Sequence, residues 1–277
     1  MSCYSRLDIK DIIKRALKED IGERDITTTA IIPKNKYVKA LLLAKEDCVV
    51  CGLGIAAEVF KVKDKNIRFK PLILDGQKIR KGRVIARIFG RAQSILIAER
   101  VALNFLSLLS GVATKTREYV DKVRPYKVKI LDTRKTLPGL RILEKYAVRI
   151  GGGYNHRMKL DEMVMIKDNH LKALGGLRRL PRVPKGYLSE IETKNLQEFK
   201  QALKLKPDII MLDNMQSGQI KRAVMLRKGI KPKIEVSGNV NLNNVREIAK
   251  AGPDMISVGA LTHSVKAIDI SLEIMWP

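Results

Sequence analysis

The sequence predicts an α/β protein with a parallel βα barrel in its C-terminal part and a smaller mixed domain before it. Apolar runs alternate with helical patterns over the C-terminal part of the chain, and strands that alternate with helices form βα units and a parallel sheet. The runs are almost continuously apolar, which is typical of strands buried on both faces. Their starts recur every ~20 to 35 residues, and six visible units, or seven if one escapes the pattern, favour a closed or nearly closed barrel.

An open, doubly wound sheet is the alternative to the barrel. No GxGxxG follows any of the runs, so the sequence offers no support for a dinucleotide site of the kind that such sheets carry.

The N-terminal part begins with residues 5–20, whose apolar spacing predicts an amphipathic helix. Residues 22–33 follow as a turn-rich connection. Short β-like runs in residues 37–90, with DGQKIRKG as a turn, predict a small antiparallel sheet. In residues 92–109 the apolar side chains recur at three- and four-residue spacing, which predicts a helix.

The C-terminal part contains the six apolar runs that we predict as barrel strands. They are KVKILDT, MVMIKD, YLSEIET, PDIIMLDN, PKIEVSG and PDMISVGA. Helical spacing lies between most of them, in GLRILEKYAVRI, KNLQEFKQALKL, SGQIKRAVMLRKG and NLNNVREIAKAG. We therefore expect an N-terminal domain at 1–110 and a barrel domain at 111–277, with a C-terminal tail that is able to return to the first domain.

The composition narrows the class of protein. The chain has 277 residues, of which 45% are hydrophobic, so a large core is available. Its first 20 residues are charged and helix-periodic, without the apolar stretch of a signal peptide. No run approaches the ~18 uninterrupted apolar residues of a membrane span. We expect a soluble, cytoplasmic protein.

The formal net charge of +25 raises the alternative of a nucleic-acid-binding protein. Such a protein interleaves basic and aromatic residues or carries a recognisable module. Aromatic residues make up only 5% of this chain, and no module is present, so we expect no nucleic acid as partner. Charge-rich surfaces are also common in heat-stable proteins.

Cys48 and Cys51 form a CxxC motif. A zinc site would need a second pair of ligands at similar spacing, and a thioredoxin-like site would need the motif at a helix N-terminus. The flanking residues indicate a strand instead, so we interpret both as structural thiols, with a redox role as the weaker alternative.

Polar residues follow each predicted barrel strand, where the functional residues of βα barrels lie. They are Asp132, Arg134 and Lys135; Lys167 and Asp168; Glu190 and Glu192; Asp213 and Asn214; Ser237 and Gly238; Ser257 and Gly259. Cations thus follow the early strands, acids the middle ones, and Ser and Gly the last two. Cations bind carboxylates and phosphates, carboxylates suit Mg²⁺, and Ser and Gly after the last strands suit a phosphate. The pattern indicates small anionic substrates with Mg²⁺ between them.

A long motif in this region resembles the signature of the quinolinate phosphoribosyltransferase family. It reads DTRKT-x-PGLR-x-LEKYAVR-x-GGG-x-NHR and is followed by IKDNH. Further matches are LKEDIGERDITT, AERVALNFLSLLSGVAT, EIET, MLDN, EVSGN and SVGALTH, so the resemblance covers essentially the whole chain. It implies an incomplete, seven-stranded α/β barrel with a smaller N-terminal α/β sandwich domain.

The resemblance also implies an activity. The enzyme would transfer the phosphoribosyl group of 5-phosphoribosyl 1-diphosphate to quinolinate, with Mg²⁺ as cofactor. The products would be nicotinate mononucleotide, CO₂ and diphosphate, in NAD biosynthesis. A site shared between subunits would make the protein a homodimer or a hexamer.

The matching positions imply roles for individual residues. Quinolinate would be bound by Arg134, His156, Arg157 and Lys167, with Arg100 of the neighbouring subunit. Lys135 and Lys167 would contact the anionic groups of both substrates, and Glu192 and Asp213 would hold the metal, directly or through water, at the phosphoribosyl end. The phosphate would be bound by Ser237, Gly238, Ser257 and Gly259. A contact from Glu190 stays open, and His170 is expected to support the loop after its strand.

One further alternative is a paralogue with the same barrel and another anionic substrate, such as nicotinate. A substrate with a single carboxylate needs fewer cations. The joint presence of Arg134, His156, Arg157 and Lys167 therefore favours a substrate with two carboxylates.

Overall fold

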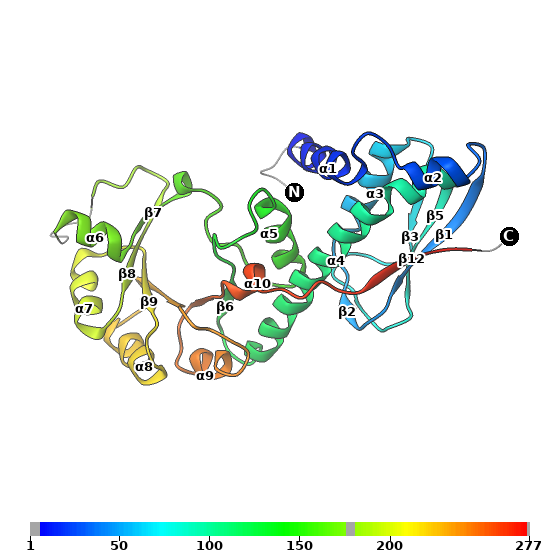
Figure 1. Cartoon of the computed structure of the whole chain (residues 1–277). Coiled ribbons are helices and arrows are strands. Elements are labelled where there is room, and N and C mark those ends of the chain that lie inside the picture. The colour runs from blue at the N-terminus through cyan, green and yellow to red at the C-terminus, as the bar shows by residue number, and fades with distance from the viewer. Residues whose placement is uncertain (1–5, 176–180, 276–277) are drawn as a thin grey trace. The chain divides into compact units, whose positions relative to one another are not determined.

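The computed structural model describes residues 6–175 and 181–275 (Figure 1). The chain divides into two compact units. The first consists of Met1–Lys115, Leu137–Gly151 and Val265–Pro277, and the second, called the barrel unit below, consists of Thr116–Thr136 and Gly152–Ser264. The first unit therefore takes in residues 137–151, which the predicted boundaries place in the second domain.

The first unit contains the antiparallel sheet that the sequence predicts. Its strands are, in order across the sheet, β12 (Ile270–Ile274), β1 (Tyr37–Ala44), β5 (Val84–Arg91) and β3 (Arg68–Pro71). A separate two-stranded ribbon joins β2 (Cys48–Val49) and β4 (Lys78–Ile79). Along β1 the more buried side chains alternate with more exposed ones, as expected of a sheet with one covered face.

The C-terminal strand closes one edge of this sheet. Leu42 of β1 lies opposite Leu272 of β12, and the Met275 N–H donates to the Lys39 carbonyl at 2.8 Å. The end of the chain therefore completes a sheet that begins at residue 37.

Among the described residues, five helices start in this unit: α1 (Arg6–Ile21), α2 (Ile26–Ile31), α3 (Leu53–Lys63), α4 (Ala92–Val123) and α5 (Arg141–Ile150). Residues 22–33, which were interpreted as a turn-rich connection, contain α2. The sequence analysis also missed α3, because residues 37–90 were interpreted throughout as β-runs. The signal was present: Ala56, Val59 and Phe60 recur at helical spacing and are fully buried.

The helix α3 also corrects the interpretation of the CxxC motif. Cys48 lies on β2, but Cys51 directly precedes Gly52, the N-cap of α3, whose φ of 105° is left-handed. The motif therefore does adjoin a helix N-terminus. Both thiols are buried and free, and burial raises the pKa of Cys48 to about 11 and raises the pKa of Cys51 as well. Thiolates react and thiols do not, so these environments suit structural cysteines.

The long helix α4 continues beyond the predicted end at residue 109. Among the described residues it is the helix that is long and apolar enough to cross a membrane by length and composition, but 61% of its apolar window is buried inside the protein. Gly111 explains part of this burial. A Cβ at this position would lie 2.4 Å from the Lys266 carbonyl oxygen, so only glycine lets the returning chain pack this closely.

The barrel unit contains a parallel sheet of six strands. They run, in spatial order, β6 (Lys129–Leu131), β11 (Met255–Ser257), β10 (Lys233–Ser237), β9 (Ile209–Asp213), β8 (Leu188–Thr193) and β7 (Met163–Ile166). These are the six predicted runs. A seventh position is reduced to one parallel bridge between Leu131 and Tyr154, which is too short to leave an apolar pattern in the sequence.

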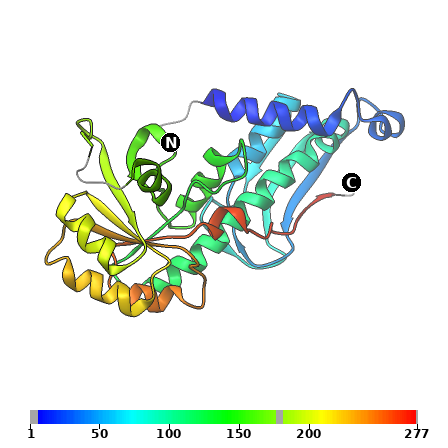
Figure 2. The ribbon, with the colours of Figure 1, turned by 60° about the vertical axis from the view of Figure 1, so that its left-hand side comes forward.

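Helices connect these strands and cover the outer side of the sheet. They are α6 (Asp168–Leu174), α7 (Leu196–Leu205), α8 (Ser217–Leu226), α9 (Val245–Lys250) and α10 (Ala260–His263), with the short η1 (Leu160–Glu162); α5 (Arg141–Ile150) belongs to the first unit. Figures 1 and 2 show α7 to α9 on the same side of the strands. An open doubly wound sheet would have helices on both faces, so the barrel-like prediction is confirmed.

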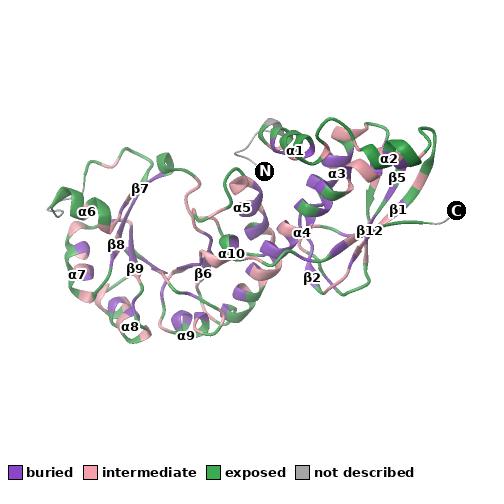
Figure 3. Ribbon diagram, viewed as in Figure 1, coloured by how far each residue is buried: buried purple, intermediate pink, exposed green. Residues whose placement is uncertain are grey.

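The strands of the barrel unit are buried along most of their length (Figure 3). In β9 the first four residues are buried and only Asp213, at the carboxyl end, is partly exposed. Two acidic side chains interrupt the apolar pattern of the described strands without any exposed surface: Glu190 of β8 and Glu235 of β10.

Candidate active site

The carboxyl ends of the central strands bring the predicted acids and the serine of the phosphate site together. Parallel pairing places Asp213 of β9 opposite Ser237 of β10. On the other side of β9, Glu192 of β8 lies opposite Met211. Because the strands run in one direction, their ends meet at the same edge of the sheet, and Glu192, Asp213 and Ser237 lie there as neighbours.

The acids and Lys167 share an electrostatic environment. Burial, and then the charge of Asp213, raise the pKa of Glu192, while the Lys167 ammonium acts in the opposite direction. A carboxylate that is costly to charge beside a second carboxylate gains from a cation. These two side chains therefore fit a divalent cation, which Mg²⁺ usually satisfies with one or two carboxylates and substrate phosphates.

Lys167 lies at the start of α6, directly after β7. Its backbone N–H donates to Nδ1 of His170 at 3.0 Å, so His170 holds the turn at the strand end, in the supporting role that we expect. Asp168 forms an ion pair with Lys194 at 2.6 Å.

Lys194 was not predicted as a site residue. The hydrogen bond to Asp168 raises its pKa most, and the charges of Glu192 and Asp213 raise it further. Its position directly after the EIET strand was the available signal.

The loop after β6 and the segment around Tyr154 form the cationic end of the site. Asp132 is fully buried. Its carboxylate accepts the His156 backbone N–H at 2.9 Å and the Asn155 side-chain amide at 2.5 Å. The Asp132 N–H donates in turn to the Tyr154 carbonyl at 3.1 Å. These bonds fix the segment that carries His156 and Arg157 against the end of β6.

The two predicted arginines lie within electrostatic range of each other. Arg157 is partly buried, and its Nη1 donates to the Met163 carbonyl at 3.1 Å. Burial, and then Arg134, lower the pKa of Arg157, with Glu190 opposing them. The Nε of Arg134 is buried and has no hydrogen-bond partner in the described part of the chain. Two guanidinium groups that repel each other, one with an unused buried donor, form a site that an anion stabilises.

Lys135 lies next to Gly259, which follows β11, the last strand of the barrel sheet in the sequence. A Cβ at Gly259 would lie 3.2 Å from Cδ of Lys135 and 3.1 Å from the His263 ring, so the absence of a side chain at Gly259 lets both approach. The hydroxyl of Thr262 donates to the Lys135 carbonyl at 2.6 Å. Lys135 is exposed and free to contact an anion above Gly259.

Gly238 follows Ser237 with a left-handed φ of 89°. A Cβ here would lie 2.4 Å from the side-chain oxygen of Asn214, and the Asn214 N–H donates to the Ser237 carbonyl at 2.9 Å. Only glycine fits this conformation and this contact without strain. The turn exposes backbone N–H groups without an intervening side chain, as a phosphate site requires.

Ser257 lies apart from these strand-end residues. Its side chain is buried, and its hydroxyl donates to Oε1 of Glu235 at 2.6 Å inside the barrel. Arg100 lies on α4 in the first unit and is exposed.

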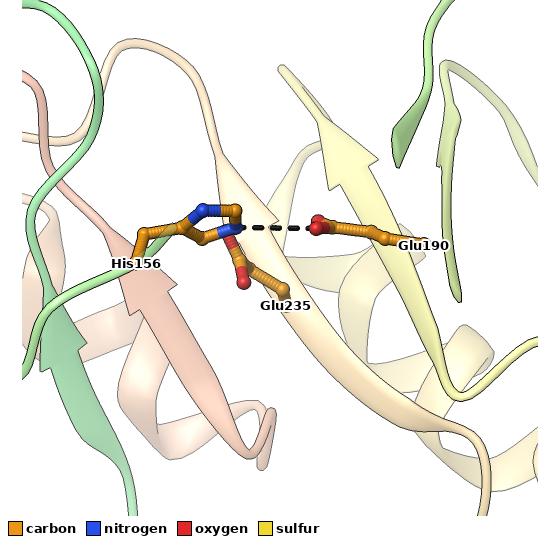
Figure 4. A group of neighbouring side chains, drawn as sticks. All are labelled: His156, Glu190 and Glu235. Atoms are coloured by element: carbon orange, nitrogen blue, oxygen red, sulfur yellow. Dashed lines mark hydrogen bonds and ion pairs between the residues drawn. The ribbon is translucent and has the colours of Figure 1, made fainter. Parts of the chain in front are cut away.

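A histidine and two glutamates form a cluster inside the barrel unit (Figure 4). Nε2 of His156 lies 3.1 Å from Oε2 of Glu190 and 3.5 Å from Oε1 of Glu235. Nδ1 of the same ring accepts the Arg157 backbone N–H at 2.8 Å. Both ring nitrogens are therefore engaged by protein groups. Sequence analysis left Glu190 open and missed Glu235, although a glutamate inside an apolar run was a readable signal.

A pocket of about 450 Å³ adjoins this region. Its lining includes Arg157, Met163, Met165, His170 and Tyr187. The volume is within the usual range for small-molecule sites, and Arg157 places a cation at its wall. A second cavity, of about 620 Å³, is formed by Ile73 and residues 77–83 of the first unit and contains none of the predicted site residues.

Comparison with known proteins identifies relatives over nearly the whole chain. The model of the quinolinate phosphoribosyl transferase N-terminal domain matches residues 25–110, and that of its C-terminal domain matches residues 112–273. A mitochondrial quinolinate phosphoribosyltransferase (decarboxylating) of Nicotiana tabacum is 43% identical over 96% of this chain and 82% of its own length. A probable nicotinate-nucleotide pyrophosphorylase (carboxylating) of Methanocaldococcus jannaschii is 43% identical over 95% of this chain and 96% of its own length.

A solved structure has the same fold. The nicotinate-nucleotide pyrophosphorylase of Francisella tularensis superposes with a TM-score of 0.92 at 40% identity and covers 99% of this chain and 98% of that one. The match extends over both units.

Proposed function

Because the chain belongs to the quinolinate phosphoribosyltransferase family, we propose that the strand-end site of its barrel unit joins quinolinate to 5-phosphoribosyl 1-diphosphate. The enzyme is a pentosyltransferase of NAD biosynthesis and releases nicotinate mononucleotide, CO₂ and diphosphate. The observation that carries the assignment of the site is the pair of Arg134 and Arg157, partly buried and with an unused donor, at the end of a barrel strand.

The cations bind quinolinate in this proposal. Arg134 and Arg157 take the two carboxylates, with Lys167 beside them and Arg100 of a neighbouring subunit closing the site. Fork-shaped guanidinium groups match carboxylates in a bidentate manner. This arrangement orients the ring so that its nitrogen points toward the ribosyl carbon.

The other half of the site binds the phosphoribosyl substrate. Ser237, Gly238 and Gly259 accommodate the 5′-phosphate, and Lys135 neutralises charge on the diphosphate. Glu192 and Asp213 would hold Mg²⁺, which supplies positive charge to the leaving diphosphate when it is bound. The raised pKa of Glu192 supports this role, because the positive charge of a bound Mg²⁺ relieves the repulsion between the Glu192 and Asp213 carboxylates.

The transfer replaces one bond of the ribosyl C1 by another. The pyridine nitrogen donates its electron pair to C1, and the bond from C1 to the diphosphate oxygen breaks, with its electrons leaving on diphosphate. The transition state resembles an oxocarbenium ion, as in glycoside cleavage. Lys135 and Lys167 stabilise the negative charge that develops on the leaving group.

Loss of CO₂ follows from the charge that the new bond creates. The ribosylated ring nitrogen is cationic, so it stabilises the electron pair left at C2 when the carboxylate departs as CO₂. A proton then replaces the carboxylate. The arginines contribute by position, and such positioning can lower the barrier by about 7–11 kcal/mol when the geometry is ideal.

Product analysis tests this function. The purified protein is incubated with Mg²⁺, 5-phosphoribosyl 1-diphosphate and either quinolinate or nicotinate. We expect mononucleotide and CO₂ from quinolinate, no product from nicotinate, and loss of activity on chelation that Mg²⁺ restores. Turnover of nicotinate alone would favour the paralogue, and activity that survives chelation would remove Mg²⁺ from the site.

A shared site implies at least a homodimer. Mixing subunits of R100A with subunits of R157A tests this. In a hybrid dimer, the site of the R100A subunit keeps its own Arg157 and receives Arg100 from its partner, so one of the two sites is intact. If the subunits exchange freely, we expect about a quarter of the wild-type activity from a one-to-one mixture. An inactive mixture in which hybrid dimers are demonstrated would place Arg100 outside the neighbour's site.

The cytoplasmic location stays a prediction from the sequence.

A further inference from the structure

The two buried glutamates of the barrel have no role in the transfer reaction described above. Glu190 and Glu235 lie on β8 and β10 and have no exposed surface. Burying an ionised carboxylate is costly unless it is paired and hydrogen-bonded. Apolar residues at these positions would continue the pattern of the neighbouring strands, so the two acids need an explanation.

The hydrogen bonds of His156 define where its proton lies. A backbone N–H can only donate, so Nδ1, which receives the Arg157 N–H at 2.8 Å, carries a lone pair. The ring proton is then on Nε2, which faces Oε2 of Glu190 at 3.1 Å and Oε1 of Glu235 at 3.5 Å. The network thus assigns a neutral imidazole that donates from Nε2 to Glu190 and accepts at Nδ1 from the Arg157 backbone.

This assignment also argues against a metal ion in the cluster. The three potential ligand atoms lie within 4.8 Å of one another, which is close enough for metal binding. However, a metal on Nε2 would need the ring proton on Nδ1, which is the atom that accepts from Arg157. The cluster fits a proton and not a metal.

Oxygen atoms on both acids remain without partners. Oε1 of Glu190 and Oε2 of Glu235 are buried and have no hydrogen-bond partner among the residues the structure describes. Burial, and then the charge of Glu190, raise the pKa of Glu235 to about 8. Glu190 remains the nearer acceptor for the His156 ring, with its Oε2 at 3.1 Å from Nε2.

Further hydrogen bonds connect His156 to Arg157, the residue that is proposed to bind the substrate carboxylate. The ring nitrogen holds the backbone of Arg157, and Asp132 holds the backbone N–H of His156 from the opposite side at 2.9 Å. The guanidinium of Arg157 is fixed further on by the Met163 carbonyl. Rotation of the ring would therefore release the segment that carries Arg157.

We propose that Glu190 and Glu235 are positioning residues, which fix the His156 ring by accepting its Nε2 proton and thereby hold Arg157 in place for the substrate carboxylate. This inference rests on the proposed function for the identity of that carboxylate. It gives His156 a role through Arg157, because the His156 ring orders the backbone of that residue.

Paired substitutions at one position test the proposal. E190Q keeps an oxygen that accepts from Nε2, whereas E190M keeps the side-chain length without an acceptor. We expect E190M to raise the KM for quinolinate about tenfold or more, which corresponds to loss of one hydrogen bond to a charged group. E190Q is expected to restore most of that loss, and the KM for 5-phosphoribosyl 1-diphosphate is expected to stay unchanged in both variants.

The exposed E247Q on α9 serves as the matched control and should leave both KM values unchanged. Equal changes in both KM values, or equal losses in E190Q and E190M, would overturn the proposal.

A measurement on the wild-type protein covers the case in which the variants do not fold. The chain has three histidines, so a ¹⁵N spectrum of selectively labelled protein resolves each ring. We expect the ring signal that is absent from an H156N variant to come from a neutral ring protonated on Nε2. A His156 ring protonated on Nδ1, or a metal bound to this ring, would overturn the proposal. This spectrum needs no turnover, so it remains decisive even if quinolinate proves not to be the substrate.

Discussion

Glu235 is the residue whose environment departs furthest from that of an ordinary carboxyl group. Burial raises its pKa from the ordinary value of 4.5 to about 8. Between these two values the folded protein binds a proton that the unfolded chain releases. The free energy of unfolding therefore falls as the pH rises through this window, by up to about 1.4 kcal/mol per pH unit from this group.

We predict that E235Q flattens this dependence, because glutamine cannot ionise. Denaturant unfolding of the wild type and the variant at pH 5 and pH 8 measures it. The wild type should lose more stability than E235Q over this range, and E247Q should behave like the wild type. Parallel curves for the wild type and E235Q would show that Glu235 titrates normally.

Arg157 shows how burial gives one side chain a specific task. Its guanidinium is partly buried next to Arg134 and is held by the Met163 carbonyl. A lysine would keep the charge but could not bind a carboxylate through two parallel hydrogen bonds.

We predict that R157K raises the KM for quinolinate about 10- to 100-fold, through loss of a charge-assisted hydrogen bond. The KM for 5-phosphoribosyl 1-diphosphate should change little. Steady-state kinetics with each substrate varied in turn measure the effect. R246K, at an exposed position on α9, is the control, and an unchanged quinolinate KM in R157K would remove Arg157 from the carboxylate site.

At the scale of elements, the ends of the barrel strands are the part of the site that the sequence predicts best. Each strand appears as an apolar run, and the polar residue after it marks the carboxyl end, so Asp213 and Ser237 could be placed on neighbouring strands. The interior could not be predicted in this way. Glu190 and Glu235 meet at His156 because β8 and β10 lie two strands apart and face the same interior, and spatial order is not written in the local pattern.

The helix α3 and the seventh barrel position show the same limit for elements. The α3 residues are apolar at helical spacing but lie among β-runs, and their tertiary neighbours decide the conformation. The Tyr154 bridge is held by bonds to Ile130 and Asp132, with no apolar run of its own. Segments with a clear apolar pattern, such as α4 and β9, could be predicted from the sequence. Elements whose conformation depends on their tertiary partners could not.

The turn after β10 gives a prediction at the same scale. Gly238 has a φ of 89°, and a Cβ there would lie 2.4 Å from the Asn214 side chain. We predict that G238A lowers the free energy of unfolding by about 1–3 kcal/mol and raises the KM for 5-phosphoribosyl 1-diphosphate, because the turn and Asn214 must shift. Thermal unfolding and steady-state kinetics measure both.

Gly218 in α8 offers a matched control. A Cβ at this helical position has nothing within 4 Å, and alanine is a better helix former than glycine. G218A should therefore leave both KM values unchanged and stabilise the protein slightly. Equal behaviour of G218A and G238A would show that the conformation of Gly238 is not required.

At the scale of the whole molecule, two separate cores are built from interleaved stretches of chain. The first unit includes residues 137–151 and 265–277, although the barrel strands lie between them. The sequence predicts two parts from the change of rhythm and a C-terminal tail that is able to return to the first, but the pattern of the tail does not identify the strand that it joins. The pairing of β12 with β1 assigns it.

We predict that deletion of residues 270–277 destabilises the first unit selectively. The deletion exposes one edge of β1, and unpaired edges promote aggregation. It also removes the ion pair between Lys45 and Glu273 at 2.5 Å. Hydrogen exchange should show loss of protection in β1 and β5, with β9 and β10 less affected. Uniform loss across both units would mean that the two fold as one cooperative body.

The place of β12 at the end of the chain also sets an order of events during synthesis. Domains usually fold in the order in which they are made, with the N-terminal one first. Here all six strands of the barrel sheet have been translated by Ser257, while the sheet of the first unit lacks its edge until Ile274 has been added. The part of the protein that is translated first is therefore completed last, and until then the unpaired edge of β1 is open to pairing with other chains.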